Sequence, residues 1–358
     1  MFAINVTATA STMEKIYDTL IIGAGQAGLS VAYFLKRHTS NFLLLDDQKQ
    51  PGGAWLHTWD SLKLFSPENY SSLSGWQLPK TSEEYPSKAN FISYLERYEK
   101  RYNFPIQRNT LVRSVHRENE YFKIISSQGT YYSKTLVSAT GTAKTPYIPT
   151  YPNQELFSGQ QLHSVHYRSP QQFTGQKVLI VGGGNSGAQV LADVSTTAHT
   201  QWVTLEEPVF LPDHIDGRYL FEAANDTYYG TNHIPNKHSL SNIVMVSSVK
   251  EAKTRGVLNA KRPFQNFYEN GVEWKNGASE HFDSVIWCTG FSPNLRHLDP
   301  LEITIDGKIS TRGTQALALP SLWLVGYGNW TGFASATIYG VGKTAKQTAK
   351  EIKAYLEN

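Results

Sequence analysis

The most informative stretch of this sequence is Tyr17-Asp-Thr-Leu-Ile-Ile-Gly-Ala-Gly-Gln-Ala-Gly28, and its pattern recurs in Gln176-Lys-Val-Leu-Ile-Val-Gly-Gly-Gly-Asn-Ser-Gly187. Both copies begin with branched aliphatic residues, which are typical of a buried parallel strand. Both then pass through a Gly-x-Gly-x-x-Gly turn into a segment with apolar residues at helical spacing. Second strands are expected at 42–45 and 201–205. Two such strand–turn–helix–strand units predict an α/β fold with two Rossmann-like dinucleotide-binding domains.

The two glycine turns have the pattern of pyrophosphate sites. In each turn the first glycine permits a tight bend, the second lets the backbone approach an anion, and the third allows close packing of helix on strand. The helix that follows offers free N–H groups to the anion. Contacts with two nucleotides are therefore predicted at Gly23, Gly25, Gln26, Ala27 and Gly28, and at Gly182, Gly184, Asn185, Ser186 and Gly187.

The residues at the ends of the second strands are expected to face the ribose groups. An acidic residue at this position binds ribose hydroxyls, and here it is Asp46, with Asp47 as the alternative. After the second turn, no Arg stands at the usual place for a 2′-phosphate. Thr204 could hydrogen-bond a hydroxyl or a phosphate, whereas Glu206 would favour NADH. The sequence leaves the choice between NADPH and NADH open.

Another glycine pair, in Gly52-Gly53-Ala54-Trp55, follows the first unit. Two glycines permit close approach of the backbone to a ring system, and a tryptophan can wall that ring. Small residues between 326 and 336 suit a helix start against a cofactor. Further cofactor contacts are predicted at Gly53, Ala54, Trp55, Trp59, Val112, Thr140, Gly141, Thr289, Gly290, Gly332, Phe333 and Ala334.

The segment between the two units reads Phe157-x-Gly159-x-x-x-His163-x-x-x-Tyr167-Arg168. It resembles the linker fingerprint FxGxxxHxxxY[K/R] of the flavin-containing monooxygenases, whereas the related Baeyer–Villiger monooxygenases carry Trp in place of Tyr167. Two Thr-Gly hinges are also similar to that family: Ala139-Thr140-Gly141 and Cys288-Thr289-Gly290-Phe291. The resemblance spans residues 17 to about 345, and within it His163 is expected to fix the linker geometry.

The resemblance implies an enzyme that binds FAD and NADPH, with NADH as the alternative. It implies that NADPH reduces the flavin, that reduced flavin and O2 form a C4a-peroxide, and that one oxygen atom passes to a small soft-nucleophile substrate. In such enzymes the flavin carries the chemistry, while the protein supplies placement and excludes water. No catalytic residue is therefore predicted.

A narrower likeness concerns the bacterial arsenic-resistance-operon flavin monooxygenases, and it implies a trivalent arsenic compound as a candidate substrate. The strings that carry it are Pro51-Gly-Gly-Ala-Trp55, Leu64-Phe-Ser-Pro67, Asp216-Gly-Arg218 and Gly326-Tyr-Gly-Asn-Trp-Thr-Gly332. The chain departs from the wider family at Phe65, where a YxSLxxN-like stretch has Asn. Because Phe cannot hydrogen-bond a peroxide, an NAD(P)H oxidase is the alternative function; Ser66 could replace the missing polar group.

Two other classes of protein share this fold. A pyridine nucleotide–disulfide reductase needs a second cysteine, and Cys288 is the one cysteine of the sequence. A non-catalytic nucleotide-sensing flavoprotein would keep both glycine turns intact.

Arg218 and Arg262 are candidates to bind the nicotinamide or its ribose phosphate, with a surface role as the alternative.

Composition narrows the partners. The 358 residues carry a formal net charge of +3, which favours neither a nucleic-acid nor a membrane partner. A single cysteine suits a reducing compartment, so a cytoplasmic protein is expected. The His and Asp residues between 213 and 238 match no familiar ligand spacing, so no metal is predicted. The remaining partners are a small-molecule substrate and O2, and the oligomeric state is left open.

The order of the motifs predicts a split domain. Residues 13–160 and 295–358 are expected to form the FAD-binding domain, and 161–294 the NAD(P)H-binding domain. The active site is expected in the cleft between them. An antiparallel hairpin is expected within 121–137, and an amphipathic helix with Ala345, Ala349, Ile352 and Leu356 on one stripe is expected near the C-terminus.

Overall fold

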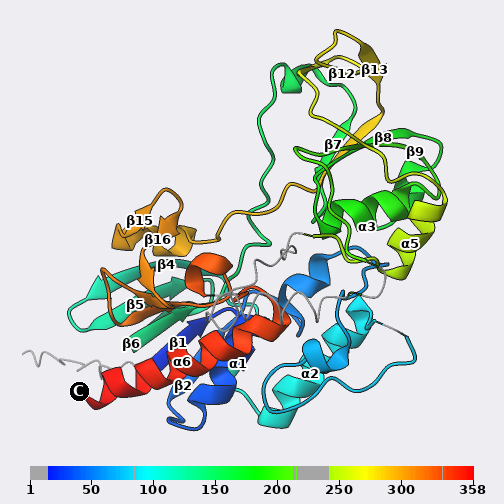
Figure 1. Ribbon diagram of the computed structural model, residues 1–358. Helices are drawn as coiled ribbons and strands as arrows, with labels where there is room; N and C mark the ends of the chain where they lie inside the picture. The colour runs from blue at the N-terminus through cyan, green and yellow to red at the C-terminus, as the bar shows by residue number, and fades with distance from the viewer. Residues whose placement is uncertain (1–14, 84, 213–214, 216–241, 333) are drawn as a thin grey trace, which may run out of the picture.

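The computed structural model describes residues 15–83, 85–212, 215, 242–332 and 334–358. These residues form two sheets with parallel cores, each with helices packed against it (Figure 1). The sheets lie in separate parts of the molecule and are joined by extended segments (Figure 1). The prediction of an α/β fold with two Rossmann-like units is therefore confirmed.

The first sheet takes its strands from both ends of the chain. Its order is β17-β18-β19-β6-β1-β2-β3, and the strands from β19 to β3 run parallel. The antiparallel pair β4–β5 joins through β5 to the first half of β6. The strands are β1 (Ile16–Ile22), β2 (Phe42–Leu45), β3 (Ile106–Gln107), β4 (Val112–Glu118), β5 (Tyr121–Ser126), β6 (Gly129–Ser138), β17 (Thr311–Arg312), β18 (Gln315–Ala316) and β19 (Leu322–Leu324).

Helices cover one face of this sheet, and the β4–β5 pair covers the other. Helices α1 (Gln26–Leu35) and α6 (Ile338–Glu357) pack against each other, and α2 (Lys88–Tyr102) packs beside α1 (Figure 1). Because successive side chains of a strand point to opposite faces, Ile21 enters the helix-side core while Leu20 and Ile22 enter the core under β4 and β5. Both cores are thus built from one alternating strand.

The second sheet is entirely parallel and has the order β10-β9-β8-β14-β7. Its strands are β7 (Gln160–His163), β8 (Lys177–Val181), β9 (His199–Val203), β10 (Ala260–Lys261) and β14 (Ser284–Trp287), with helices α3 (Asn185–Val194) and α5 (Ser247–Thr254). The smaller pieces are β11 (Asn266–Tyr268), β12 (Gly271–Glu273) and β13 (Ser279–His281), and the hairpin of β15 (Thr304–Ile305) and β16 (Lys308–Ile309). Six short 3-10 helices complete the described chain: η1 (Gly53–His57), η2 (Glu68–Tyr70), η3 (Gln154–Leu156), η4 (Pro170–Phe173), η5 (Arg296–Leu301) and η6 (Asn329–Thr331).

Most elements expected from the sequence are present where they were predicted. The hairpin within 121–137 is β5–β6, and α6 buries Ala345, Ala349 and Ile352. The predicted bounds of the strand at 201–205 are wrong at both ends, because β9 covers His199–Val203. Strand structure stops there since the Thr204 hydroxyl donates to the carbonyl oxygen of Glu206 at 2.7 Å, which turns the chain.

Close packing within each glycine turn explains why the third glycine is needed. A Cβ added to Gly28 would lie 1.9 Å from the carbonyl oxygen of Gly23, and one added to Gly187 would lie 2.1 Å from that of Gly182. Both distances are far inside van der Waals contact. The helix can therefore approach the strand only where the side chain is absent.

The core around the second sheet also contains side chains from the first part of the chain. Trp59, Leu62 and Tyr85 are buried in the same apolar cluster as Tyr167 and Leu191 of α3. Burying an aromatic or leucine side chain contributes roughly 1.5–3 kcal/mol. These three side chains therefore attach the segment after η1 to the second sheet.

We predict that Gly187→Ala destabilises the protein by about 3 kcal/mol, the upper part of the usual range for overpacking, because the backbone carbonyl of Gly182 cannot move away. Chemical denaturation of the purified variant measures this change in the free energy of unfolding. Gly184→Ala is the matched control, since a Cβ at Gly184 meets no atom within 4 Å. Equal stability of the two variants would contradict the packing argument.

Candidate cofactor and active site

The first glycine turn lies directly against the second glycine pair predicted from the sequence. A Cβ on Gly53 would stand 2.8 Å from the Cα of Gly25, so the two backbones touch. On Gly25 itself a Cβ would be no closer than 3.8 Å to Gly53, which leaves the turn open on its outer side. An open glycine at the N-terminus of α1 is what a pyrophosphate group requires. The residues present thus fit a dinucleotide.

Gln26 connects three distant segments around this turn. Its side-chain oxygen accepts a hydrogen bond of 3.0 Å from the Trp55 indole, and its side-chain nitrogen donates to the carbonyl oxygen of Ala336 at 2.9 Å. The Trp55 ring also packs edge-on against Phe91, with centroids 4.8 Å apart. Trp55 is thereby held beside the turn, where it was predicted to wall a ring system.

The expected ribose acid Asp46 is buried at the end of β2, and it is paired with a residue that the sequence did not single out. Arg108 forms an ion pair with Asp46 and a second one with Glu99 of α2. Burial raises the pKa of the Asp46 carboxyl, while Arg108 opposes this shift. The alternative acid, Asp47, pairs with Lys144. The backbone N–H of Thr110 donates to the Asp46 carbonyl oxygen at 2.8 Å. This bond ties the chain just before Val112, the first residue of β4, to the end of β2.

The two Thr-Gly hinges are held by hydrogen bonds to the segments that cross between the sheets. The Thr140 hydroxyl donates to the carbonyl oxygen of Asn294 at 2.7 Å, and the Thr289 hydroxyl donates to that of Tyr147 at 2.5 Å. Gly141 and Gly290 both have positive φ, at 64° and 83°. Such backbone angles suit glycine and let each strand end turn sharply.

His163 of the linker motif lies at the second hinge. The backbone N–H of Val165 donates to Nδ1 at 3.2 Å, so Nε2 carries the proton and donates to the carbonyl oxygen of Gly290 at 2.9 Å. Burial lowers the pKa of His163, which keeps the ring neutral. These contacts favour the role expected for His163, fixing the linker geometry.

The other linker residues are packed or bonded within the protein. Phe157 is buried in the core of the second sheet, and Gly159 makes room for its ring, since a Cβ there would lie 2.4 Å from the Phe157 Cζ. Arg168 donates through Nη1 to the carbonyl oxygens of His57 and Val165, each at 2.8 Å. Its guanidinium therefore joins a backbone carbonyl of η1 to one of the linker itself.

The second glycine turn is open at Gly184, where an added Cβ would meet no atom within 4 Å. Asn185 is the first residue of α3, and its side chain binds the segment that precedes α5. The side-chain nitrogen donates to the backbone carbonyl oxygen of Asn242 at 3.0 Å, and the side-chain oxygen accepts from the N–H of Val244 at 2.9 Å. Ser186 is half-buried in the first turn of α3. The turn thus fits a second dinucleotide.

Arg262 lies beside the predicted nicotinamide ribose position, although it is remote in sequence. It donates to the Thr204 hydroxyl at 3.0 Å and forms an ion pair of 2.6 Å with Glu207. Glu206 and Glu207 are both exposed. The end of β9 therefore presents one guanidinium and two carboxylates, so the structure offers groups for a phosphate and for free ribose hydroxyls.

Residues near the C-terminus return to the first turn ahead of α6. Gly332 has φ of 123°, and Ala334 is buried with φ of 50°. The Thr337 hydroxyl caps α6 by accepting from the N–H of Gly340 at 3.0 Å. Several residues considered in the sequence lie outside the described residues: Phe333, Asp213, His214, Asp216, Arg218, His233 and His238.

Phe65 and Trp59 both lie toward the second sheet. Phe65 is half-buried and packs on the same cluster that contains Trp59. The Ser66 hydroxyl is buried and hydrogen-bonded to that of Ser71 at 2.8 Å. Ser66 is thus engaged within its own loop, and the position of the family's Asn is occupied by an apolar ring.

The chemistry expected of Cys288 is also limited by its surroundings. Burial raises the pKa of the Cys288 thiol to about 12, so the thiol stays protonated at neutral pH.

Within the described residues, no group of three or more His, Cys, Asp or Glu side chains could hold a metal ion. A search of the same residues finds no helix with the length and apolar character needed to cross a membrane.

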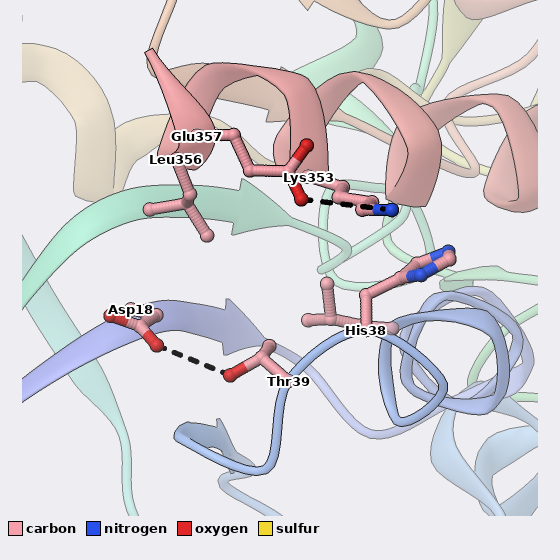
Figure 2. A pocket seen from close by; sticks show the side chains of 7 residues that line it. Asp18, His38, Thr39, Lys353, Leu356 and Glu357 are labelled. Carbon is pink, nitrogen blue, oxygen red and sulfur yellow. Dashed lines mark hydrogen bonds and ion pairs between the residues drawn. The ribbon is translucent and has the colours of Figure 1, made fainter.

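A small pocket lies apart from both glycine turns, between the C-terminal ends of α1 and α6. It is lined by Asp18, Leu35, His38, Thr39, Lys353, Leu356 and Glu357 (Figure 2). The Thr39 hydroxyl donates to Asp18 at 3.1 Å, and Lys353 pairs with Glu357 at 3.6 Å. Since the first glycine turn is at the opposite end of α1, this pocket is not part of the candidate site.

Two open glycine turns on two parallel sheets define an oxidoreductase with two dinucleotide-binding units. The family described as pyridine nucleotide-disulphide oxidoreductase matches residues 20–326, and the chain belongs to this family. The family is FAD- and NAD(P)-dependent, in agreement with the cofactors that the turns indicate.

Known proteins similar to this chain include monooxygenases. A flavin-containing monooxygenase from Stenotrophomonas maltophilia is 44% identical, with a TM-score of 0.88 over 94% of this chain and 98% of that one. The uncharacterised oxidoreductase CzcO of Bacillus velezensis is 33% identical over 347 residues, which are 94% of this chain and 99% of the relative. The probable indole-3-pyruvate monooxygenase YUCCA1 of Arabidopsis thaliana is 26% identical over 97% of this chain and 92% of the relative. The chain is thus an enzyme of the flavin monooxygenase/oxidoreductase type.

We predict that Gly184→Ala raises the KM for NADPH about tenfold, equivalent to about 1.4 kcal/mol, because a methyl group would stand where the pyrophosphate must approach. Steady-state kinetics measures the change. FAD content and thermal midpoint, which depend on the first turn and on packing, should stay at wild-type values. A normal KM would show that no anion approaches Gly184.

We predict that Glu207→Gln increases the ratio of kcat/KM for NADPH to that for NADH by up to about fivefold. The change frees Arg262 from an exposed ion pair worth roughly 0.2–1 kcal/mol, so the guanidinium can bind a 2′-phosphate. Kinetics with both nucleotides measures the ratio. Glu269→Gln, which removes the same charge at the exposed turn after β11, is the control and should leave it unchanged.

Proposed function

We propose that this protein is an FAD-dependent monooxygenase that oxidises NAD(P)H and transfers one oxygen atom from O2 to a small soft-nucleophile substrate. The observation that carries the proposal is the pair of open glycines, Gly25 and Gly184, each at the N-terminus of a helix that follows a parallel strand. Two such turns suit two nucleotides that exchange electrons. The monooxygenase assignment is supported by the 44% identical Stenotrophomonas protein.

The proposal includes a split domain arrangement. Residues 13–160 and 295–358 would bind FAD, and 161–294 would bind NAD(P)H. It is supported by sheet membership: the strands within 16–138 and 311–324 share one sheet, and β7, β8, β9, β10 and β14 form the other, with β7 starting one residue before the expected boundary. The active site would lie between the two. The single cysteine supports a reducing, cytoplasmic setting.

The two glycine turns, Asp46, Trp55 and Phe65 each have a task in this proposal. The turns 23–28 and 182–187 bind the two pyrophosphates, and Asp46, held by Arg108, orients a ribose. Trp55, held by Gln26, walls the flavin site. When bound, FAD supplies the reaction with O2, and NAD(P)H supplies the electrons. The protein's own part is to bind, orient and exclude water, and Phe65 serves the last of these.

The substrate class follows from the same chemistry. A nitrogen or sulfur compound is the proposed acceptor of oxygen, and a trivalent arsenical is a second candidate on the sequence likeness described above. Indole-3-pyruvate, named for the Arabidopsis relative, is a third compound to test. An NAD(P)H oxidase is the competing function, because an apolar Phe65 offers no hydrogen bond beside the flavin site.

Anaerobic and aerobic turnover distinguish these functions. The purified yellow protein is mixed with NADPH or NADH without O2, and the loss of flavin absorbance is followed. With O2, nucleotide oxidation, peroxide release and oxygenated product are measured for trimethylamine, a thioether, indole-3-pyruvate and a trivalent arsenical. Oxygenated product in proportion to NAD(P)H supports the proposal. Stoichiometric peroxide with every compound would establish an oxidase, and a flavin that neither nucleotide reduces would indicate a sensor.

We predict that Phe65→Asn lowers the fraction of oxidised NADPH that ends as hydrogen peroxide by about fivefold, since one added hydrogen bond contributes about 1 kcal/mol. Peroxide and product are assayed in parallel. Phe65→Leu is the matched control, because it stays apolar and should release at least as much peroxide as the wild type. If both variants behave alike, the amide group at this position has no influence on coupling.

A further inference from the structure

We propose that Asp193 is a positioning residue that fixes the NAD(P)H side of the molecule against the FAD side through Ser61 and Tyr167. This inference rests on the proposed function and deepens it, because it names the side chains that set the distance between the two cofactors. None of the three belongs to a glycine turn.

One carboxylate oxygen makes both contacts. Asp193 Oδ2 accepts a hydrogen bond of 2.6 Å from the Tyr167 hydroxyl and one of 2.8 Å from the Ser61 hydroxyl. Tyr167 is fully buried, and burial together with Asp193 raises the pKa of its hydroxyl, so that it remains a donor. Asp193 therefore joins Tyr167 of the linker motif to Ser61 on the FAD side. Ser61 stands 132 residues before Asp193 in the chain.

Asp193 is rigidly placed on the NAD(P)H side. It lies in the last turn of α3, the helix that begins at the second glycine turn. Its neighbours Ala192 and Val194 are buried in the core of the second sheet. Arg255 holds this helix end by donating to the carbonyl oxygens of Ala192 at 2.8 Å and Ser195 at 3.0 Å. A shift of Asp193 would thus require a shift of the whole helix.

Ser61 is equally well placed on the FAD side. Lys88, the first residue of α2, donates from its backbone N–H to the carbonyl oxygen of Leu62 at 3.0 Å and from its ammonium group to that of Thr58 at 2.6 Å. Residues 58–62, the connecting segment, are therefore fixed to α2 at both ends. The segment follows Trp55, which is bonded to Gln26 at the first glycine turn.

The connecting segment thus runs from one nucleotide turn to the helix that begins at the other. Trp59 and Leu62, on either side of Ser61, are buried in the second core, so apolar packing brings the parts together while the hydroxyl–carboxylate contact sets their register. Hydride transfer from a nicotinamide to a flavin needs reacting atoms about 3–3.5 Å apart, and a misplacement of about 1 Å can cost on the order of 100-fold in rate. Loss of the contact should therefore slow flavin reduction without removing either cofactor.

The test uses the full-length FAD-loaded protein and three variants: Ser61→Ala, Asp193→Ala and the double variant. The rate constant of anaerobic flavin reduction is measured at saturating NADPH and NADH, together with FAD affinity and thermal midpoint. Each single variant should reduce the rate about tenfold with FAD affinity unchanged. The double variant should be no slower than Asp193→Ala, because both changes remove the same contact.

Thr39→Ala is the matched control. Its hydroxyl also donates to a carboxylate, that of Asp18 at 3.1 Å, but this pair lies at the far end of α1 (Figure 2). Its reduction rate should equal that of the wild type. Unchanged rates in the Ser61 and Asp193 variants of a reducible protein would overturn the inference alone, as would a fall matched by an equal loss of FAD affinity. A wild-type flavin that neither nucleotide reduces would overturn the proposed function, and this inference with it.

Discussion

At two glycine turns a helix approaches its strand very closely, and this close approach shapes both nucleotide-binding units. At Gly28 and Gly187 the backbone of the helix lies so near a carbonyl oxygen that a single methyl group cannot be accommodated. This packing aims the first N–H groups of α1 and α3 at open space beside Gly25 and Gly184. Each turn thereby combines a packed side, which supports the fold, with an open side, which can receive an anion.

Around this constraint, polar side chains attach each turn to distant parts of the chain. Gln26 ties the first turn to Trp55 and to the segment before α6. Asn185 ties the second turn to the segment before α5. His163 connects the linker with the second hinge, and Arg168 connects it with η1. The hydrogen bond from Arg168 to His57 and the apolar cluster that contains both Trp59 and Leu191 connect the two parts of the molecule.

Membership of the pyridine nucleotide-disulphide oxidoreductase family describes this architecture more than the reaction. Disulfide chemistry needs a thiolate and a second sulfur. Here the one cysteine, Cys288, is half-buried, and its raised pKa keeps the thiol protonated at neutral pH. The open glycines, in contrast, suit any chemistry that moves electrons between two nucleotides. The pattern of the flavin-containing monooxygenases has Asn where this chain has Phe65, whose ring packs on the apolar cluster of the second sheet.

Hydrophobic period and glycine spacing act between near neighbours, so they were enough to predict the two strand–turn–helix–strand units, the β5–β6 hairpin and the C-terminal helix. They also indicated which turns could hold nucleotides. The folded chain, in contrast, reveals three long-range contacts that the sequence did not predict. Arg108 pairs with Asp46, Arg262 donates to Thr204, and Asp193 accepts hydrogen bonds from Ser61 and Tyr167. Even the end of β9 depended on a turn formed by Thr204. Such pairs are set by how separate elements pack, and residues far apart in the chain carry no local signal of the partner they will meet.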